Sequence, residues 1–242
     1  MNRNRIFNRP IEPAWAAAAL DVALDGGSGA DGRERLEIRL RDEEMAPVAR
    51  SKVVEALHPV WINPPGETAS FIAWAREHAD EVADLRPVHL VALMATYPFF
   101  GDLVAAVGRM LRNEGHVDSL EVRARLKGQW GDRDSIGVAT RKGILTLRSF
   151  GVVVGGRGST KSAAGARFSM DGDWALWAAA ALLLSRGSDT TDAGTVETAP
   201  EFFFLDLRVG GSSTFPLLER ITSGDARTRL AMRSALPDAR PS

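Results

Sequence analysis

The residues best suited to chemistry in this 242-residue chain are basic and hydroxyl side chains between positions 133 and 167. Within this stretch, no Asp or Glu occurs from Ser135 to Met170. Cationic donors without neighbouring acids are suited to binding phosphate oxygens rather than to acid–base catalysis. The candidate DNA-binding residues are Arg133, Ser135, Arg141, Lys142, Arg148, Arg157, Lys161 and Arg167.

The charge of the chain is unevenly distributed, although its formal net charge is only −1. Residues 97–170 carry a net charge of +6, whereas residues 1–96 carry −4 and residues 171–242 carry −3. A basic region inside a near-neutral chain is typical of a surface that binds nucleic acid. A basic surface that is merely solvated, or one that docks on an acidic protein, explains the same distribution equally well, so charge alone leaves these interpretations open.

Other kinds of chemistry have little support in the sequence. The chain contains no Cys, which excludes disulfides, thiolate nucleophiles and thiolate metal ligands. His58, His78 and His89 lack the four-residue spacing of paired histidines in helical metal sites. The GxSxG motif of serine hydrolases is also missing, and the acids form no recognisable catalytic pair. We therefore expect neither an enzyme nor a bound metal or other cofactor.

The glycine-rich segment Gly155 to Gly165 (GGRGSTKSAAG) allows one alternative chemistry. Gly155, Lys161 and Ser162 match the first, seventh and eighth positions of the nucleotide-binding P-loop, GxxxxGK[ST]. Thr160 occupies the sixth position, where a P-loop needs glycine to turn its amides toward phosphate. The segment also leads into a strand-like pattern instead of the required helix. Nucleotide binding is therefore a weaker hypothesis than DNA binding or protein docking.

Three helical patterns and a hairpin pattern must position the basic residues. Apolar spacing predicts a helix over 98–113, a short extended link at 116–118 and a second helix that Asp118 or Ser119 caps. A third helix is predicted to start at a cap formed by Asp132 or Asp134 and to end at Gly151. Residues 152–154 and 166–170 are expected to form the two strands of a hairpin, with the glycine-rich loop at its tip.

The third predicted helix has an apolar face and a basic face. The apolar stripe comprises Ile136, Ala139 or Thr140, Gly143, Ile144, Leu147 and Phe150. Positions 134, 138, 141, 145 and 148 share the opposite side, and a helix of this width fits the DNA major groove. Gly137 and Gly143 each weaken such a helix by about 1 kcal/mol relative to Ala. Close packing against a neighbouring helix would explain why glycine occurs there.

The stretch from Thr96 to Met170, about a third of the chain, resembles a winged helix-turn-helix domain in its order of elements. More loosely, RSKVVEALHPVWINPP (50–65) and YPFFGDL (97–103) are similar to the small DNA-binding winged-helix subunit of bacteriophage exclusion (BREX) systems. This resemblance implies double-stranded DNA binding without catalysis, as part of bacterial antiviral defence, with proteins of the same operon as further partners. A winged-helix adaptor that assembles a larger protein complex is the alternative.

The fold class expected from these patterns is mainly α with a small β-hairpin. The winged helix-turn-helix domain at 96–170 would lie between a mostly helical N-terminal domain, 1–95, and a small α/β region, 171–242. In the N-terminal domain we expect an exposed arm or loop over 2–13, a flexible turn over 26–32, and helices over 14–24, from 47, from 69 and from 89. The alternation over 33–41 favours a half-buried strand, and helix within 33–54 is the alternative. In the C-terminal region we expect a helix over 174–186, a mobile loop over 187–200, a strand or short helix over 201–209, and helices from 216 and over 226–235.

No segment has the composition of a membrane span. The most apolar run, Trp174 to Leu184, is eleven residues long, about half of the roughly 20 residues that a bilayer requires. The sequence therefore predicts a cytoplasmic protein that has no membrane partner.

Overall fold

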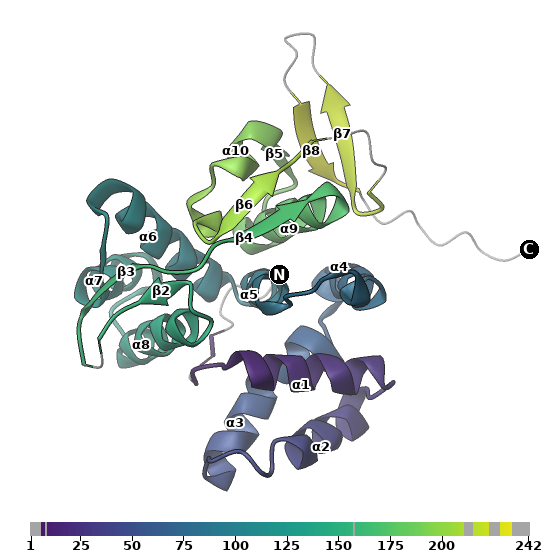
Figure 1. Cartoon of the computed structure of the whole chain (residues 1–242), viewed down its shortest axis with the longest axis vertical. Helices are drawn as coiled ribbons and strands as arrows, with labels where there is room; N and C mark the ends of the chain where they lie inside the picture. Colours follow the sequence, from purple (N-terminus) through teal and green to yellow (C-terminus); the bar gives the residue numbers. More distant parts are fainter. Residues whose placement is uncertain (1–5, 8, 157, 211–214, 223–227, 234–242) are drawn as a thin grey trace, which may run out of the picture.

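The computed structural model is mainly helical, with three small sheets among the residues it describes (Figure 1). The structure describes residues 6–7, 9–156, 158–210, 215–222 and 228–233. A cluster of buried apolar side chains runs from Phe7 to Leu230 and includes residues from all three regions of the chain. The mainly α class expected from the sequence is thus confirmed.

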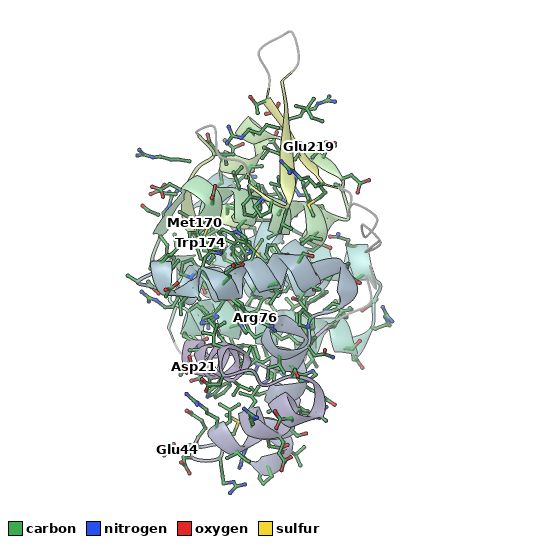
Figure 2. The ribbon with its side chains drawn as sticks, turned by 90° about the vertical axis from the view of Figure 1, so that its right-hand side faces the viewer. Asp21, Glu44, Arg76, Met170, Trp174 and Glu219 are labelled. Carbon is green, nitrogen blue, oxygen red and sulfur yellow. The ribbon has the colours of Figure 1, made fainter. Side chains whose placement is uncertain are left out.

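The chain is stacked along one long axis. Figure 2 shows this order from top to bottom through the labelled residues Glu219, Trp174, Arg76, Asp21 and Glu44. The C-terminal strands lie at one end and the first helices of the chain lie at the other. The basic central region, with α6, α7 and α8, lies at one side of this stack (Figure 1).

Helices make up the N-terminal part of the chain. The helices expected near residues 14, 47, 69 and 89 are present, and prolines begin α1 and α3, where the missing N–H costs no hydrogen bond. The elements are α1 (Pro13–Leu24), α2 (Gly29–Arg39), α3 (Pro47–Leu57), the π-helical turn η1 (His58–Ile62), α4 (Gly66–Glu77), the short turn η2 (Ala79–Glu81) and α5 (Arg86–Thr96).

The strand favoured over 33–41 is wrong and the helical alternative is correct, because these residues belong to α2 and the turn that follows it. Leu36 and Leu40 are buried, whereas Ile38 is 52% exposed. A strand would have placed all three side chains on one face, but a helix brings positions four apart to the same side. The flexible turn predicted over 26–32 is also partly helical, since α2 begins at Gly29.

The exposed N-terminal arm is a second wrong prediction for the part of the arm that the structure describes. Phe7 and Ile11 are buried, and the Phe7 ring lies 5.1 Å from that of Tyr97. The backbone N–H of Ile11 donates to Thr146 Oγ1 at 2.9 Å, and Ser149 Oγ donates to the Ile11 carbonyl at 2.8 Å. Only the fold could reveal these partners, because each lies 90 or more residues away along the chain.

The central region follows the predicted order of elements. Its helices are α6 (Pro98–Glu114), α7 (Ser119–Trp130) and α8 (Asp134–Ser149). The strands are β1 (Val117–Asp118), β2 (Val153–Val154) and β3 (Lys161–Ala164), and they form an antiparallel sheet in the order β1-β3-β2. Asp118 caps α7 as predicted, because its carboxylate accepts a 2.8 Å hydrogen bond from the Leu120 N–H.

The hairpin exists, but the prediction of its second strand is wrong. Residues 161–164, inside the expected loop, pair with both β1 and β2, with Ser162 opposite Val117 and Ala164 opposite Val153. The predicted return strand is instead β4 (Phe168–Asp171), which pairs in parallel with β6 (Leu205–Arg208). The segment does have strand character, but its pairing partner lies in the C-terminal region.

The C-terminal region is built around α9 (Gly172–Arg186), the helix predicted there. Nine consecutive residues of α9, 175–183, are buried, and α9 packs against α4, α5 and α6. Trp177 stacks on Phe71 with ring centroids 4.4 Å apart, and its indole N–H donates to the Phe71 carbonyl at 2.9 Å. The remaining elements are β5 (Thr190–Asp192), α10 (Ala193–Glu197), the short turn η3 (Pro200–Phe202), β7 (Leu218–Thr222) and β8 (Thr228–Met232).

Three C-terminal predictions are wrong. The mobile loop at 187–200 contains β5 and α10, and the helices expected from 216 and within 226–235 are the strands β7 and β8. These strands form one antiparallel sheet in the order β5-β8-β7. Leu218 and Leu230 are buried at the base of the sheet. Cross-strand pairing decides the conformation of such short segments, and local propensity does not reveal it.

Candidate nucleic-acid interface

The start of α7, the outer face of α8 and residues 158–160 enclose a groove of about 520 Å³, which we call the α7–α8 groove. Helices α7 and α8 and the loop before β3 lie side by side at one edge of the molecule, and the groove lies among them (Figure 1). The polar side chains that line it belong to Ser119, Arg123, Asp134, Thr140, Arg141, Arg148, Ser159 and Thr160. Leu120, Val138, Ile144 and Leu145 are its apolar lining residues.

Helix α8 presents its outer face because most of its inner face packs against the rest of the protein, with Thr140 and Ile144 at the border of the groove. The predicted inner stripe is buried as expected, including Ile136, Thr140, Ile144 and Leu147. A Cβ on Gly143 would lie 2.6 Å from Leu103 Cδ1, so glycine permits the close approach of α8 to α6. Gly143 lowers the helical propensity of α8 but allows α8 to pack tightly against α6.

Two arginines on different helices contribute free cationic groups to the groove. Arg123 on α7 and Arg141 on α8 are both exposed, and neither forms an ion pair with another residue of the described ranges. The Arg123 guanidinium lies against Gly137, where a Cβ would be 2.7 Å from Arg123 Nε. Gly137 therefore lets α7 and α8 share one cationic surface.

The acids near the start of α8 behave differently from each other. Asp132 forms an ion pair with Lys127, and this hydrogen bond lowers the pKa of the Asp132 carboxyl. Asp134 lines the groove and begins α8, where a negative charge favours the helix dipole. Three arginines and one aspartate therefore line the groove, which leaves it net positive.

Arg148 ties the loop to α8. Its Nη2 donates to the Ser159 carbonyl at 2.9 Å and to Ser162 Oγ at 2.8 Å, and its Nε donates to Ser162 Oγ at 3.2 Å. The Ser162 side chain is buried between the strands. Arg148 was predicted as a direct DNA contact, and the structure additionally gives it the role of positioning the loop beside α8.

Internal hydrogen bonds order the loop before β3. Ser159 Oγ accepts from the Lys161 N–H at 3.1 Å, and the Ser119 N–H donates to the Thr160 carbonyl at 2.9 Å. Lys161 is exposed and has no ion-pair partner in the described part of the chain. Arg157, the other predicted cation of this loop, lies outside the described residues. Strand β3 begins at Lys161, where a P-loop would require a helix.

The remaining predicted residues lie at different places around α8. Arg133 and Ser135 are exposed at its start, and Arg133 Nη2 donates to the Trp130 carbonyl at 3.3 Å. Lys142 is half-buried on the flank of α8, away from the groove lining. Burial, together with the charges of Arg141 and Arg9, lowers the pKa of Lys142.

Arg167 does not join the groove residues. Its Nη2 donates to Asp206 Oδ1 at 2.7 Å and to the Leu205 carbonyl at 3.0 Å, which holds β4 to β6. It lines a different cavity, together with Met170 and Trp174, which are labelled in Figure 2. The structure therefore separates Arg167 from the cationic side chains of α7 and α8.

The contribution of Arg123 on α7 to this site was not predicted from the sequence. Arg123 follows the buried Val122 by one position, so the outward face of α7 was readable from its apolar spacing. What the sequence did not reveal was that this face meets Gly137 of α8. Leu120, which is 60% exposed, and the hydroxyl groups of Ser119 and Thr160 also line the groove, because α7 and the loop before β3 both pack beside α8.

His58, His78 and His89 do not converge on a common site. Nε2 of His58 lies 2.8 Å from the Gly29 carbonyl, and Nδ1 of His78 lies 2.9 Å from the Trp74 carbonyl. His89 is buried in the core, with its ring 5.4 Å from that of Trp61. Across the described ranges, no three His, Asp or Glu side chains gather closely enough to hold a metal ion.

Within the part of the chain that the structure describes, no single helix is both long enough and apolar enough to cross a membrane. Helices α5 and α6 reach that length and composition only when taken together, and they are bent by 120° at their junction. Comparison with protein-family models, with curated proteins and with solved structures found no match to this chain.

Proposed function

We propose that this chain is a non-enzymatic protein of the winged helix-turn-helix type that binds double-stranded DNA through the α7–α8 groove. The observation that carries the proposal is the convergence of Arg123, Arg141 and Arg148 on one groove from two helices. In this arrangement α8 enters the major groove. Residues 158–161 then lie against the adjoining backbone, as the wing.

The charges and the shape of the groove support DNA as the ligand. Arg141 lies midway along the outer face of α8, where a guanidinium can donate to guanine or to phosphate. Ser119 at the start of α7 adds a hydroxyl and the helix N-terminus, which favours a phosphate group. Arg148 fixes the loop that carries Lys161, so less ordering of the loop is needed when DNA binds.

The order of elements also supports this assignment. A helix, a short strand, two helices and a hairpin follow one another, and β1 pairs with β3 so that the hairpin lies beside the start of α7. This brings the loop and both helices to a single face, as a winged helix requires for simultaneous contacts with a groove and a backbone.

Binding of a 24-base-pair duplex across a range of salt concentrations tests the proposal. Fluorescence anisotropy would compare the wild type with Arg123→Ala/Arg141→Ala and with the control Arg208→Ala, which removes an exposed arginine on β6. We expect the double variant to bind at least about tenfold more weakly and its salt slope to fall by up to about 1.8, at roughly 0.9 for each lost phosphate contact. Equal affinity of all three proteins would refute the groove as the DNA site.

A second candidate function is an adaptor that docks an acidic amphipathic helix in the same groove. The observation that favours it is the exposure of Leu120 (60%), Val138 (37%) and Leu145 (37%) beside the arginines. Apolar and basic groups together suit a helix with apolar and acidic faces. If no duplex binds at low salt, and a complex with an operon-encoded protein is lost in Leu120→Ser, the adaptor is the better description.

The place of the protein in antiviral defence is a proposal that rests on the sequence resemblance to the BREX subunit. A host strain that lacks the protein is expected to be plated more efficiently by phage. Complementation with wild type, but not with Arg123→Ala/Arg141→Ala, would link that phenotype to the groove. Unchanged plating efficiency would remove the support for a defence role while leaving DNA binding open.

A further inference from the structure

The N-terminal arm crosses the surface between α8 and α3 at a fixed position. Ile11 is hydrogen-bonded to Thr146 and Ser149 of α8, whereas Phe7 is inserted between Tyr97 and Phe100, with ring centroids 5.1 and 5.3 Å away. These two anchors hold the backbone on both sides of Arg9.

Arg9 connects the basic flank of α8 to a second cavity. This cavity, of about 490 Å³, is bordered by Arg9, Lys52 and His58 among other residues of the arm and of α3. On its other side, Arg9 lies two residues before Ile11, whose N–H donates to Thr146 Oγ1, and Thr146 lies one helical turn after Lys142 on α8. Consistent with this proximity, the pKa of Lys142 is lowered by burial and then by the charges of Arg141 and Arg9. A row of cations therefore runs from Arg141 in the α7–α8 groove through Lys142 and Arg9 to Lys52.

The cations of this row lack internal counterions. Arg9, Lys52 and Lys142 form no ion pair with any residue that the structure describes. The Nε of Arg9 is buried and has no hydrogen-bond partner among those residues. Glu55 is the acid that borders the cavity, and its carboxylate lies 4.0 Å from Arg33, which partly satisfies it. Like charges held together in this way repel one another, and a bound anion relieves that repulsion.

We infer that Arg9, Lys52 and Lys142, which we call the arm row, form a second phosphate-contact surface that extends the DNA interface from α8 across the N-terminal arm to α3. The inference rests on the proposed DNA binding of the α7–α8 groove. The partner is the backbone of the same duplex, because the arm row is continuous with Arg141 of the groove. Its contacts carry no sequence information and contribute affinity that depends on salt.

The test measures affinity and salt slope on the 24-base-pair duplex for the full chain and for Arg9→Ala/Lys52→Ala. The expected result is a three- to tenfold weaker affinity at about 0.1 M salt, with a salt slope lower by about 1.8, because roughly 0.9 is lost for each phosphate contact. Arg109→Ala/Arg208→Ala is the matched control, since it removes the same charge at exposed positions on α6 and β6. This control should retain the wild-type slope.

Two further variants guard against effects on folding. Lys52 is exposed, so Lys52→Ala alone should leave the unfolding transition unchanged and lower the slope by about half as much. Arg9→Lys keeps the charge and should restore most of the slope.

The possible outcomes separate the two proposals. If Arg9→Ala/Lys52→Ala binds like the wild type while Arg123→Ala/Arg141→Ala binds weakly, the arm row is wrong and the groove assignment stands. If the wild type does not bind duplex DNA at low salt, both are wrong.

Discussion

The buried histidine of α5 should make this protein lose stability in mildly acidic solution, and His89→Leu should remove that loss. His89 is 1% exposed, and neither of its ring nitrogens has a hydrogen-bond partner among the described residues. Burial lowers its pKa from 6.5 to about 3, although the nearby Asp84 carboxylate acts in the opposite direction. The folded protein therefore keeps this ring neutral at pH values where the unfolded chain protonates it.

The magnitude follows from the difference in proton binding. Between pH 6.5 and about 3 the unfolded state binds more protons at His89 than the folded state does, so stability falls as the pH is lowered. Each pH unit across this window costs up to about 1.4 kcal/mol. At pH 4.5 the free energy of unfolding should therefore be lower by roughly 2–3 kcal/mol on account of this one group.

Urea denaturation of the wild type and His89→Leu between pH 4.5 and 7.5 measures the effect. Leu is close to His in volume and needs no hydrogen bond, so the variant should be at least as stable at pH 7.5. Carboxylates with lowered pKa, such as Asp132, reduce stability in acid in both proteins and cancel in the difference. If the two proteins lose stability in parallel as the pH falls, His89 is not held neutral and the reasoning is refuted.

Four other substitutions test the packing of α6 and α7 and the hydrogen bonds that hold the arm and the loop. Gly108→Ala should destabilise the protein by about 1–3 kcal/mol, because its Cβ would overlap the backbone of η3; Gly128→Ala, with no atom within 4 Å of its Cβ, should instead stabilise α7 by up to about 1 kcal/mol in the same urea assay. Thr146→Val removes the acceptor of the Ile11 N–H and should cost about 1–3 kcal/mol, and an unchanged urea midpoint would contradict the anchoring of the arm. Arg148→Gln should raise amide hydrogen exchange in 159–162 about tenfold through the loss of its bonds to the loop, whereas equal exchange would show that the loop is ordered without it.

Local patterns were sufficient to predict the helices that carry the site. The stripe from Ile136 to Phe150 is buried as its helical spacing indicates, and Asp118 accepts the hydrogen bond expected of an N-cap. A helix of this length buries one continuous face, so its apolar residues recur every three to four positions in the local sequence. The basic outer face of α8 was predictable for the same reason.

The local sequence did not predict the pairing of the short strands, or the conformation of a segment whose alternating apolar residues fit both a strand and a helix. Leu36, Ile38 and Leu40 fit a strand as well as a helix until Ile38 is seen to be 52% exposed. The strand character of residues 168–171 was recognised, but their partner is β6, 37 residues further along the chain. This pairing depends on α9, which follows β4 along the chain and packs against both strands, and no local pattern contains that packing.

In the candidate site, too, local sequence determined some features and tertiary packing determined others. Arg141 and Arg148 were identifiable because residues 135–170 contain basic side chains and no acids, whereas Arg123 of α7 was not identified. Tertiary packing decides which of the cations lie together. Gly137 leaves room for Arg123 at the groove, and Arg148 is hydrogen-bonded to the loop. Arg167 instead forms an ion pair with Asp206, away from the groove. Charge is a property of each residue, and the local sequence therefore specifies it completely. A binding surface requires charges from separate elements to be brought within reach of one ligand, and only the packing of α7, α8, β3 and the N-terminal arm achieves that.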